Sequence, residues 1–383
     1  MHQDELQLLF KNHRETALAD RYICNDHIVP ILKKLPVRFQ VSKIGKSVNE
    51  ETIYKVQFGS GAKKLLFWSQ MHGNESTTTK AVFDVFKLFS TDLPLVKHVF
   101  GHFTIVVIPI LNPDGARAYT RENANSIDLN RDAQALSQPE SKVLHDLFNT
   151  FQPDFCFNLH GQRTIFNVGD TNKPATASFL APAQDALCTI TPTRKKAMEV
   201  IVAMTRSLQT VIPDQIGIYD DAFNINCVGD TFQSHNVPTV LFEAGHYKCD
   251  YSRDTTREFM FQSLLIAMNY IATHTVSGDL YKPYLSIPQN NKQFYDIIIR
   301  NAVFDSYGEK RIKDIAIQYQ ETLVVESIEF IPKVVKIENL QNYFAHKEID
   351  ANKHQVITTK FEAIELGYEN DFVLINNELY SLK

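Results

Sequence analysis

Continuous apolar runs alternate with segments of helical periodicity along the first two thirds of the chain. Runs typical of strands that are buried on both faces lie at 63–69, 103–111, 154–159 and 238–242. Apolar residues recur at helical spacing over 75–89, 139–151, 197–210 and 257–274. Period-two alternation indicates a hairpin at 37–41 and 53–58. This order predicts an α/β fold with a mixed, mainly parallel sheet flanked by helices.

The pattern changes after Gly278. Short β-type segments, separated by Asn, Gly, Asp and Lys, lie at 294–299, 315–319, 323–325, 334–337, 356–359 and 372–375. We therefore expect two domains, with the boundary near 277–279. Residues 1–278 would form the α/β domain, and residues 279–383 a small all-β C-terminal domain whose role the sequence leaves open.

Composition excludes several classes of protein. The 383 residues carry a net charge of −5 and no Lys/Arg stripe, which argues against a nucleic-acid partner. No apolar run reaches the ~20 residues that would span a membrane, and the polar N-terminus contains no signal-peptide pattern. Five cysteines without a Cys-x-x-Cys pair indicate reduced thiols. These features together predict a cytoplasmic protein.

Four polar side chains occur where predicted strands end. His72 and Glu75 follow the first of the long apolar runs, His160 ends the third, and Glu243 ends the fourth. Ligands of open α/β sheets bind beyond the carboxyl ends of the strands, so we expect these side chains to lie close together. His72, Glu75 and His160 supply the N and O donors that zinc prefers, and three ligands leave a fourth position for water. The sequence predicts one zinc ion per chain.

Glu243 has a different predicted role. It would leave its strand facing the same cleft and accept a proton from water that zinc has made more acidic. Each of the four residues alone has an ordinary structural explanation, such as a capped strand end or a helix-start acid. Four such groups at strand ends favour a hydrolase.

The order of motifs resembles the zinc metallocarboxypeptidase family, the carboxypeptidase A superfamily, over roughly residues 40–275. The motifs that carry the resemblance are His72-x-x-Glu75, Asn112-Pro113-Asp114-Gly115, Arg121, Asp128-Leu129-Asn130-Arg131, His160 and the strand that ends at Glu243.

The resemblance implies a role for each matching residue. His72, Glu75 and His160 would ligate zinc, and Glu243 would be the general base and acid. Arg121 would stabilise the oxyanion, and Asn130 and Arg131 would bind a substrate carboxylate. Tyr219 falls about where the family carries a mobile substrate-capping Tyr, although a packing role fits it equally well. The implied substrate is a peptide, or an N-acyl amino acid, with a free carboxylate.

Two alternatives to a carboxypeptidase remain open at this point. Gly161-Gln162 after His160 departs from the digestive enzymes, and a trailing β domain also occurs in the succinylglutamate desuccinylase and aspartoacylase branch, which deacylates N-acyl amino acids. A metal-binding module without catalysis is the other alternative. Glu243 and Arg121 speak against it, because a binder needs neither a base nor an oxyanion cation.

Overall fold

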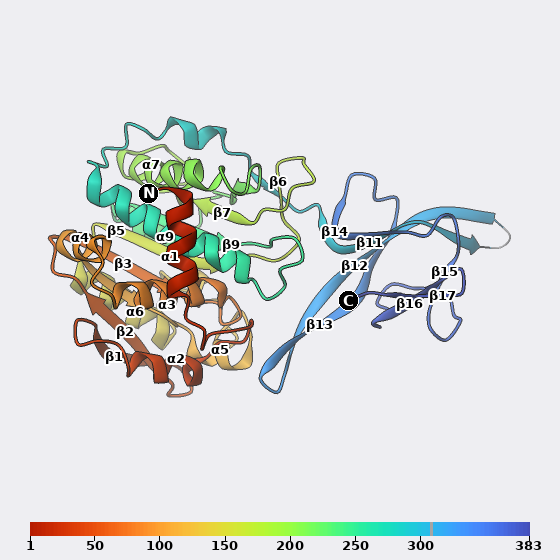
Figure 1. The fold of residues 1–383 in the computed structure, drawn as a ribbon, viewed down its shortest axis with the longest axis horizontal. Helices are drawn as coiled ribbons and strands as arrows, with labels where there is room; N and C mark the ends of the chain where they lie inside the picture. The colour runs from red at the N-terminus through yellow and green to blue at the C-terminus, as the bar shows by residue number, and fades with distance from the viewer. Residues whose placement is uncertain (307–308) are drawn as a thin grey trace. The chain divides into compact units, whose positions relative to one another are not determined.

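The chain divides into two compact units, which are described separately. A computed structural model describes residues 1–306 and 309–383 (Figure 1). The first unit consists of Met1–Gln162 and Ala175–Asn290, and the second of Arg163–Pro174 and Asn291–Lys383. Among the described residues, no helix is both long enough and apolar enough to cross a membrane.

A mixed eight-stranded sheet forms the centre of the first unit, with the order β1-β2-β4-β3-β5-β9-β7-β8. Its inner strands β4, β3, β5 and β9 are mutually parallel, while β1, β2 and β7 introduce antiparallel pairs. The predicted fold class is confirmed. The strands are β1 (Gln40–Lys46), β2 (Thr52–Phe58), β3 (Lys63–Ser69), β4 (Phe103–Ile108), β5 (Phe155–Gly161), β7 (Ala177–Leu180), β8 (Ile216–Ile218) and β9 (Thr239–Ala244).

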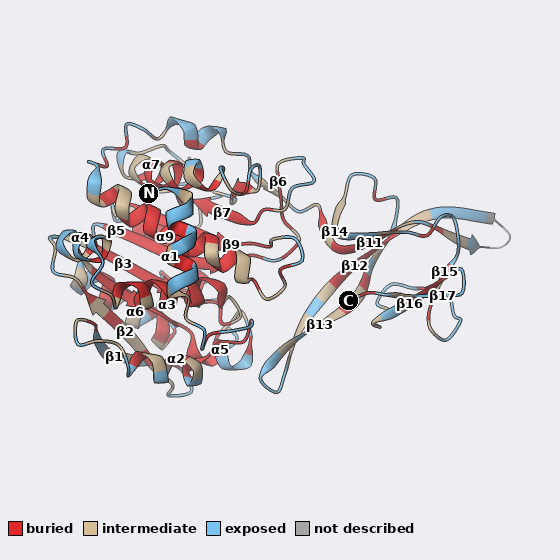
Figure 2. Ribbon diagram, in the orientation of Figure 1, coloured by how far each residue is buried: buried red, intermediate tan, exposed pale blue. Residues whose placement is uncertain are grey.

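Helices cover both faces of this sheet, which is why its central strands are almost wholly buried (Figure 2). On one face, Phe67 lines the same small cavity as Val82 of α3 and Leu264 of α9. On the other face, Trp68 packs with Phe232 of α8. The helices are α1 (Gln3–His13), α2 (Asn25–Leu32), α3 (Thr77–Phe89), α4 (Pro94–His102), α5 (Pro113–Ala118), α6 (Pro139–Phe151), α7 (Pro192–Leu208), α8 (Val228–Ser234) and α9 (Asp254–Thr273), with 3-10 turns η1 (Leu129–Arg131) and η2 (Lys282–Ser286).

The motif Asn112–Gly115 begins helix α5. Asn112 is the N-cap, and its Oδ1 accepts a hydrogen bond from the backbone N–H of Gly115. Pro113 occupies the first helical position, where its missing N–H costs nothing. Asn112 and Pro113 are therefore the start signal of a short helix.

The second unit is all-β, as expected. Its larger sheets, among the residues that the structure describes, have the orders β13-β12-β11-β14 and β15-β16-β17. The segments predicted as separate strands at 315–319 and 323–325 fall on one long strand, β12, which ends at Val324, so that Val325 lies in the turn after it. The strands are β11 (Phe294–Ser306), β12 (Glu309–Val324), β13 (Ser327–Glu338), β14 (Phe344–Asp350), β15 (Val356–Ile357), β16 (Phe372–Ile375) and β17 (Glu378–Ser381), while the two-residue strands β6 (Asn167–Val168) and β10 (Asn290–Asn291) fall where the chain passes between units.

The limits of the units differ from the predicted division at 277–279. Residues 279–290 stay with the first unit, where Tyr284 is buried and its hydroxyl accepts the backbone N–H of Ala181. Residues 163–174 join the second unit, in which Phe294 donates its N–H to the carbonyl of Ile165. Neither feature has a signal in the local hydrophobic pattern.

Candidate metal centre

The loop between β3 and α3 presents His72 and Glu75. Gln70, in a left-handed conformation at φ 48°, donates its Nε2 to the carbonyls of Ile23 and Gly73 and so holds the loop in place. The backbone of Gly73 lies close to that of Gly115. A Cβ at position 73 would therefore lie 1.9 Å from the carbonyl carbon of Gly115. Only glycine allows this approach.

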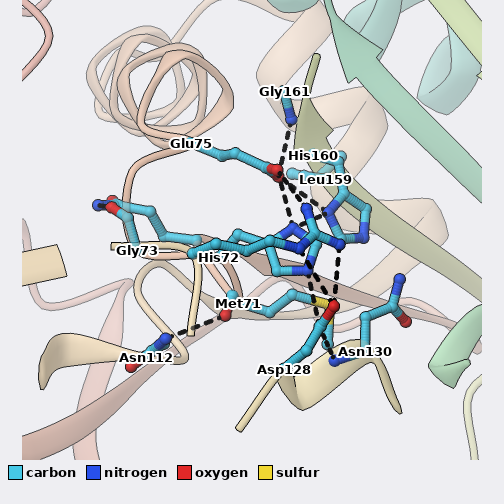
Figure 3. A network of polar contacts seen from close by, with 12 residues as sticks. Met71, His72, Gly73, Glu75, Asn112, Asp128, Asn130, Leu159, His160 and Gly161 are labelled. Atoms are coloured by element: carbon cyan, nitrogen blue, oxygen red, sulfur yellow. Dashed lines mark hydrogen bonds and ion pairs between the residues drawn. The ribbon is translucent and has the colours of Figure 1, made fainter. Parts of the chain in front are cut away.

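Three donor groups converge from this loop and from the end of β5 (Figure 3). Nδ1 of His72 lies 2.8 Å from Oε1 of Glu75, and Nδ1 of His160 lies 2.9 Å from Oε2 of the same carboxylate. The two Nδ1 atoms are 3.2 Å apart. These atoms all lie within 4.8 Å of one another, as the ligands of a single ion do.

The donor set fits zinc. Two imidazole nitrogens and one carboxylate are ligands of catalytic zinc sites, which keep a fourth position open. Both histidines are only 2% exposed. Burial lowers the pKa of His160, which favours the neutral ring that a metal ligand requires. Burial raises the pKa of Glu75, but its two histidine neighbours outweigh this and hold the pKa well below its usual range.

Asp128 supports the centre from behind, although the sequence reasoning gave it no role. Its Oδ1 lies 3.0 Å from Nε2 of His72, and its Oδ2 accepts hydrogen bonds of 3.1 and 3.0 Å from Arg121. A carboxylate on the far nitrogen fixes the ring orientation and the tautomer of a metal-binding histidine. In the sequence, the one signal for this role of Asp128 is its place at the start of the Asp-Leu-Asn-Arg motif.

Glu243 stands beside the ligands because of strand register. β5 and β9 run parallel with His160 opposite Glu243, so both side chains leave the same face. Burial raises the pKa of Glu243 well above its usual range, and the nearby Glu75 carboxylate raises it further. Its Oε2 is buried and has no hydrogen-bond partner within the described part of the chain. A proton can therefore rest on this oxygen.

Arg121 adds a fixed positive charge to the same place. Its Nη1 lies 3.5 Å from Oε1 of Glu75, and its side chain is 42% exposed. Burial lowers the pKa of the guanidinium, but the carboxylates of Glu75 and Asp128 outweigh this and raise it. The group is thus a permanent cation at the edge of the centre.

Asn130 and Arg131 lie in η1, directly after Asp128. Oδ1 of Asn130 accepts the backbone N–H of Val228 at 2.9 Å, so the amide is oriented with its Nδ2 as the donor end. Arg131 is exposed, and its Nη1 donates to the carbonyl of Asn130 at 2.7 Å and lies 3.1 Å from Sγ of Cys227. Both side chains offer N–H donors, as a carboxylate requires.

Tyr219 follows β8 and lies within electrostatic reach of the centre. Burial raises the pKa of its hydroxyl to about 12, and the Glu243 and Glu75 carboxylates contribute to the rise. His246, three residues after Glu243, is buried in the loop that follows β9, with its ring centroid 4.6 Å from that of Tyr251.

A comparison with protein-family models matches residues 26–252 to zinc carboxypeptidase. The chain belongs to the zinc carboxypeptidase family. The match includes every residue of the centre from His72 to Glu243. It also runs through residues 163–174 of the second unit, and it ends before residues 291–383. The family depends on zinc, in agreement with the donor set found here.

Individual members of the zinc carboxypeptidase family are distant relatives. Carboxypeptidase SOL1 of Arabidopsis thaliana is 24% identical over 173 residues, which are 39% of this chain and 35% of that protein. Carboxypeptidase 2 of Trichophyton rubrum is 27% identical over 101 residues, covering 26% of this chain and 19% of the relative. The chain thus matches only about a fifth to a third of the length of these relatives.

Solved structures share the fold at low identity. Carboxypeptidase A of Helicoverpa armigera superposes with a TM-score of 0.53 and 14% identity, covering 70% of this chain and 80% of the other. A metallo-carboxypeptidase of Burkholderia cenocepacia gives a TM-score of 0.50 and 16% identity, with 64% and 69% covered. The first unit therefore has the architecture of the zinc carboxypeptidase family.

Proposed function

We propose that this protein is a metallocarboxypeptidase that hydrolyses the peptide or amide bond next to a free carboxylate. The observation that carries the proposal is the convergence of His72, Glu75 and His160, with a carboxyl oxygen of Glu243 beside them that has no partner among the described residues. His72, Glu75 and His160 would hold one zinc ion. When bound, zinc supplies Lewis acidity that polarises a carbonyl and acidifies a water molecule.

The remaining residues divide the work of hydrolysis. Glu243 takes a proton from the attacking water at a carboxylate oxygen and returns it to the leaving nitrogen. Arg121 neutralises the negative charge that develops on the carbonyl oxygen. Asn130 and Arg131 bind the terminal carboxylate of the substrate through N–H donors, and a guanidinium does so with two parallel hydrogen bonds. Tyr219 closes over the bound substrate.

A deacylase of N-acyl amino acids is the second candidate. The β-rich segment 291–383, which follows the zinc carboxypeptidase match, favours it, since the deacylase branch carries such a domain. The two candidates share their chemistry and both recognise a free carboxylate. They differ in what is released, which is an amino acid from a peptide or a small acid from an N-acyl amino acid.

The experiment measures the products that zinc-loaded protein releases from three sets of substrates. These are free-ended peptides, the same peptides with an amidated terminus, and N-acetyl and N-succinyl amino acids. The Glu243→Gln variant is the control. A carboxypeptidase releases terminal amino acids from the first set alone. Release of acetate or succinate would select the deacylase. Zinc binding without hydrolysis of any substrate would leave the non-catalytic module.

A further inference from the structure

Arg253 is a buried arginine beside the ends of β5 and β9. It is the N-cap residue of α9 and is only 2% exposed. Its Nη2 donates to the carbonyl of Gln162 at 3.0 Å, and its Nη1 donates to the carbonyl of Ala244 at 2.9 Å. Nη1 also donates to the carbonyl of Gly245. One guanidinium therefore joins the residue that follows β5 to the end of β9.

The carbonyls that Arg253 binds come shortly after two residues of the metal centre. Ala244 is the residue after Glu243, and Gln162 lies two positions after His160. His160 and Glu243 are register partners, and the N–H of Gln162 donates to the carbonyl of Ala244 at 3.0 Å. Arg253 therefore closes the ladder between β5 and β9 at its carboxyl end, where the centre lies.

The backbone of Arg253 has a conformation that is unusual for a large side chain. Its φ of 62° lies in the left-handed region, which glycine adopts without strain. The N–H of Arg253 donates to the carbonyl of Asp250 at 3.0 Å, and the Asp250 carboxylate accepts the successive N–H groups of residues 254–256. The turn before α9 is thus fixed on both sides of Arg253, so the guanidinium extends from a fixed point.

We propose that Arg253 is a positioning residue, which holds Glu243 at a fixed place relative to His160. The inference rests on the proposed function, in which Glu243 takes a proton from the attacking water while His160 is a zinc ligand. A general base must lie within hydrogen-bond reach of that proton, and a displacement of about 1 Å can cost about a hundredfold in rate. A planar guanidinium suits this task, because its rigid fork of donors spans two strands, whereas the ammonium of lysine is a point charge on a flexible stem.

The first test compares Arg253→Lys with Arg257→Lys. Arg257 is another buried arginine of α9. Its partners are the Asp84 carboxylate and the carbonyls of Glu15 and Leu18, so it does not bind the strand ends through these bonds. Both replacements keep the charge and remove a fork of hydrogen bonds. We expect Arg253→Lys to lower kcat at least about tenfold, with KM and zinc content unchanged, because no group that binds substrate or zinc is removed. Arg257→Lys should keep the wild-type kcat, even where it lowers the melting temperature.

Arg253→Gly with added guanidinium ion provides a second variant. Glycine adopts the left-handed backbone without strain and leaves the place of the side chain to a free ion. Millimolar guanidinium can donate to the same carbonyls, so it should raise the kcat of Arg253→Gly several-fold and leave the wild type and Arg253→Lys unchanged. A merely stabilising role of the arginine would not give this recovery, because guanidinium weakens folded proteins in general. If Arg253→Gly does not fold, the comparison of the two lysine variants still decides the matter.

Amide hydrogen exchange gives a readout that needs no turnover. In zinc-loaded Arg253→Lys we expect faster exchange at the N–H of Gln162, which bonds to the carbonyl of Ala244, and unchanged exchange in β3. This result would support the positioning role even if no substrate were hydrolysed, an outcome that would reject the proposed function alone. Unchanged exchange at Gln162, or a wild-type kcat in Arg253→Lys, would overturn the inference and keep the carboxypeptidase. An equal loss of kcat in Arg257→Lys would also overturn it, because the effect would then reflect general stability.

Discussion

The Nδ1 atoms of His72 and His160 lie 3.2 Å apart, although 88 positions separate the two residues in the chain. They meet because β3 and β5 are parallel neighbours, so both strands reach the same edge of the sheet. A single proton can bridge only two of the three groups, whereas one metal ion can bind both Nδ1 atoms and the Glu75 carboxylate at the same time.

Replacing His160 by Ala should abolish stoichiometric zinc binding, because it removes one of three donors. Elemental analysis of purified protein should give about one zinc per chain for the wild type and much less for the variant. The exposed His102 offers a matched control, and His102→Ala should keep its zinc. Undiminished zinc in His160→Ala would remove this residue from the ligand set.

Asp128→Asn should weaken zinc binding without preventing it. The carboxylate orients the His72 ring through Nε2, and loss of such a partner typically costs about 10–100-fold in metal affinity. Competition with a chelator measures the change. A wild-type affinity for zinc in the variant would show that Asp128 orients Arg121 rather than His72.

Glu243→Gln should retain zinc and turn over at least about a hundredfold more slowly, because the amide keeps the shape of the side chain and cannot take a proton. The decisive comparison is the zinc content and kcat of the same preparation. Near wild-type turnover would reject the mechanism. Loss of zinc would instead identify Glu243 as a ligand.

Arg131→Ala should impair the hydrolysis of free-acid substrates selectively, since the exposed guanidinium is assigned only to their carboxylate.

Asn130→Ala should also impair the hydrolysis of free-acid substrates. It should in addition destabilise the protein by about 1–3 kcal/mol, because the buried N–H of Val228 loses its acceptor. Kinetics with free and amidated peptides, together with denaturant unfolding, separate these effects. Equal losses on both peptide types in Arg131→Ala would make the arginine structural.

A chain that ends at Asn290 should become protease-sensitive between 163 and 174. Within the second unit, Gln318 donates to Oγ1 of Thr164 at 2.7 Å, and Asn167 donates to Oε1 of Gln293 at 2.8 Å. Truncation removes these partners and leaves the segment without a fold of its own. Limited proteolysis with mass spectrometry locates the cuts, and the full-length protein is the control. Resistance of the truncated chain would show that residues 163–174 fold independently of the second unit.

The sequence by itself determined the strands and helices that build the sheet of the first unit. Continuous apolar runs specify strands covered on both faces, and their ends placed His72, His160 and Glu243 at one edge. This inference works because parallel strands must finish on the same side of a sheet. The order of motifs determined the family for the same reason, since it records the polar residues that the strands bring to that edge.

Tertiary structure alone decided the partners of these residues. The contact of Asp128 with His72 joins two loops that are 56 residues apart in the sequence. The attachment of residues 163–174 to the second unit likewise depends on contacts with residues more than 100 positions away. Local patterns report which face of an element is buried. They carry no information on which distant loop will supply a neighbour, because that is fixed only when the whole core packs.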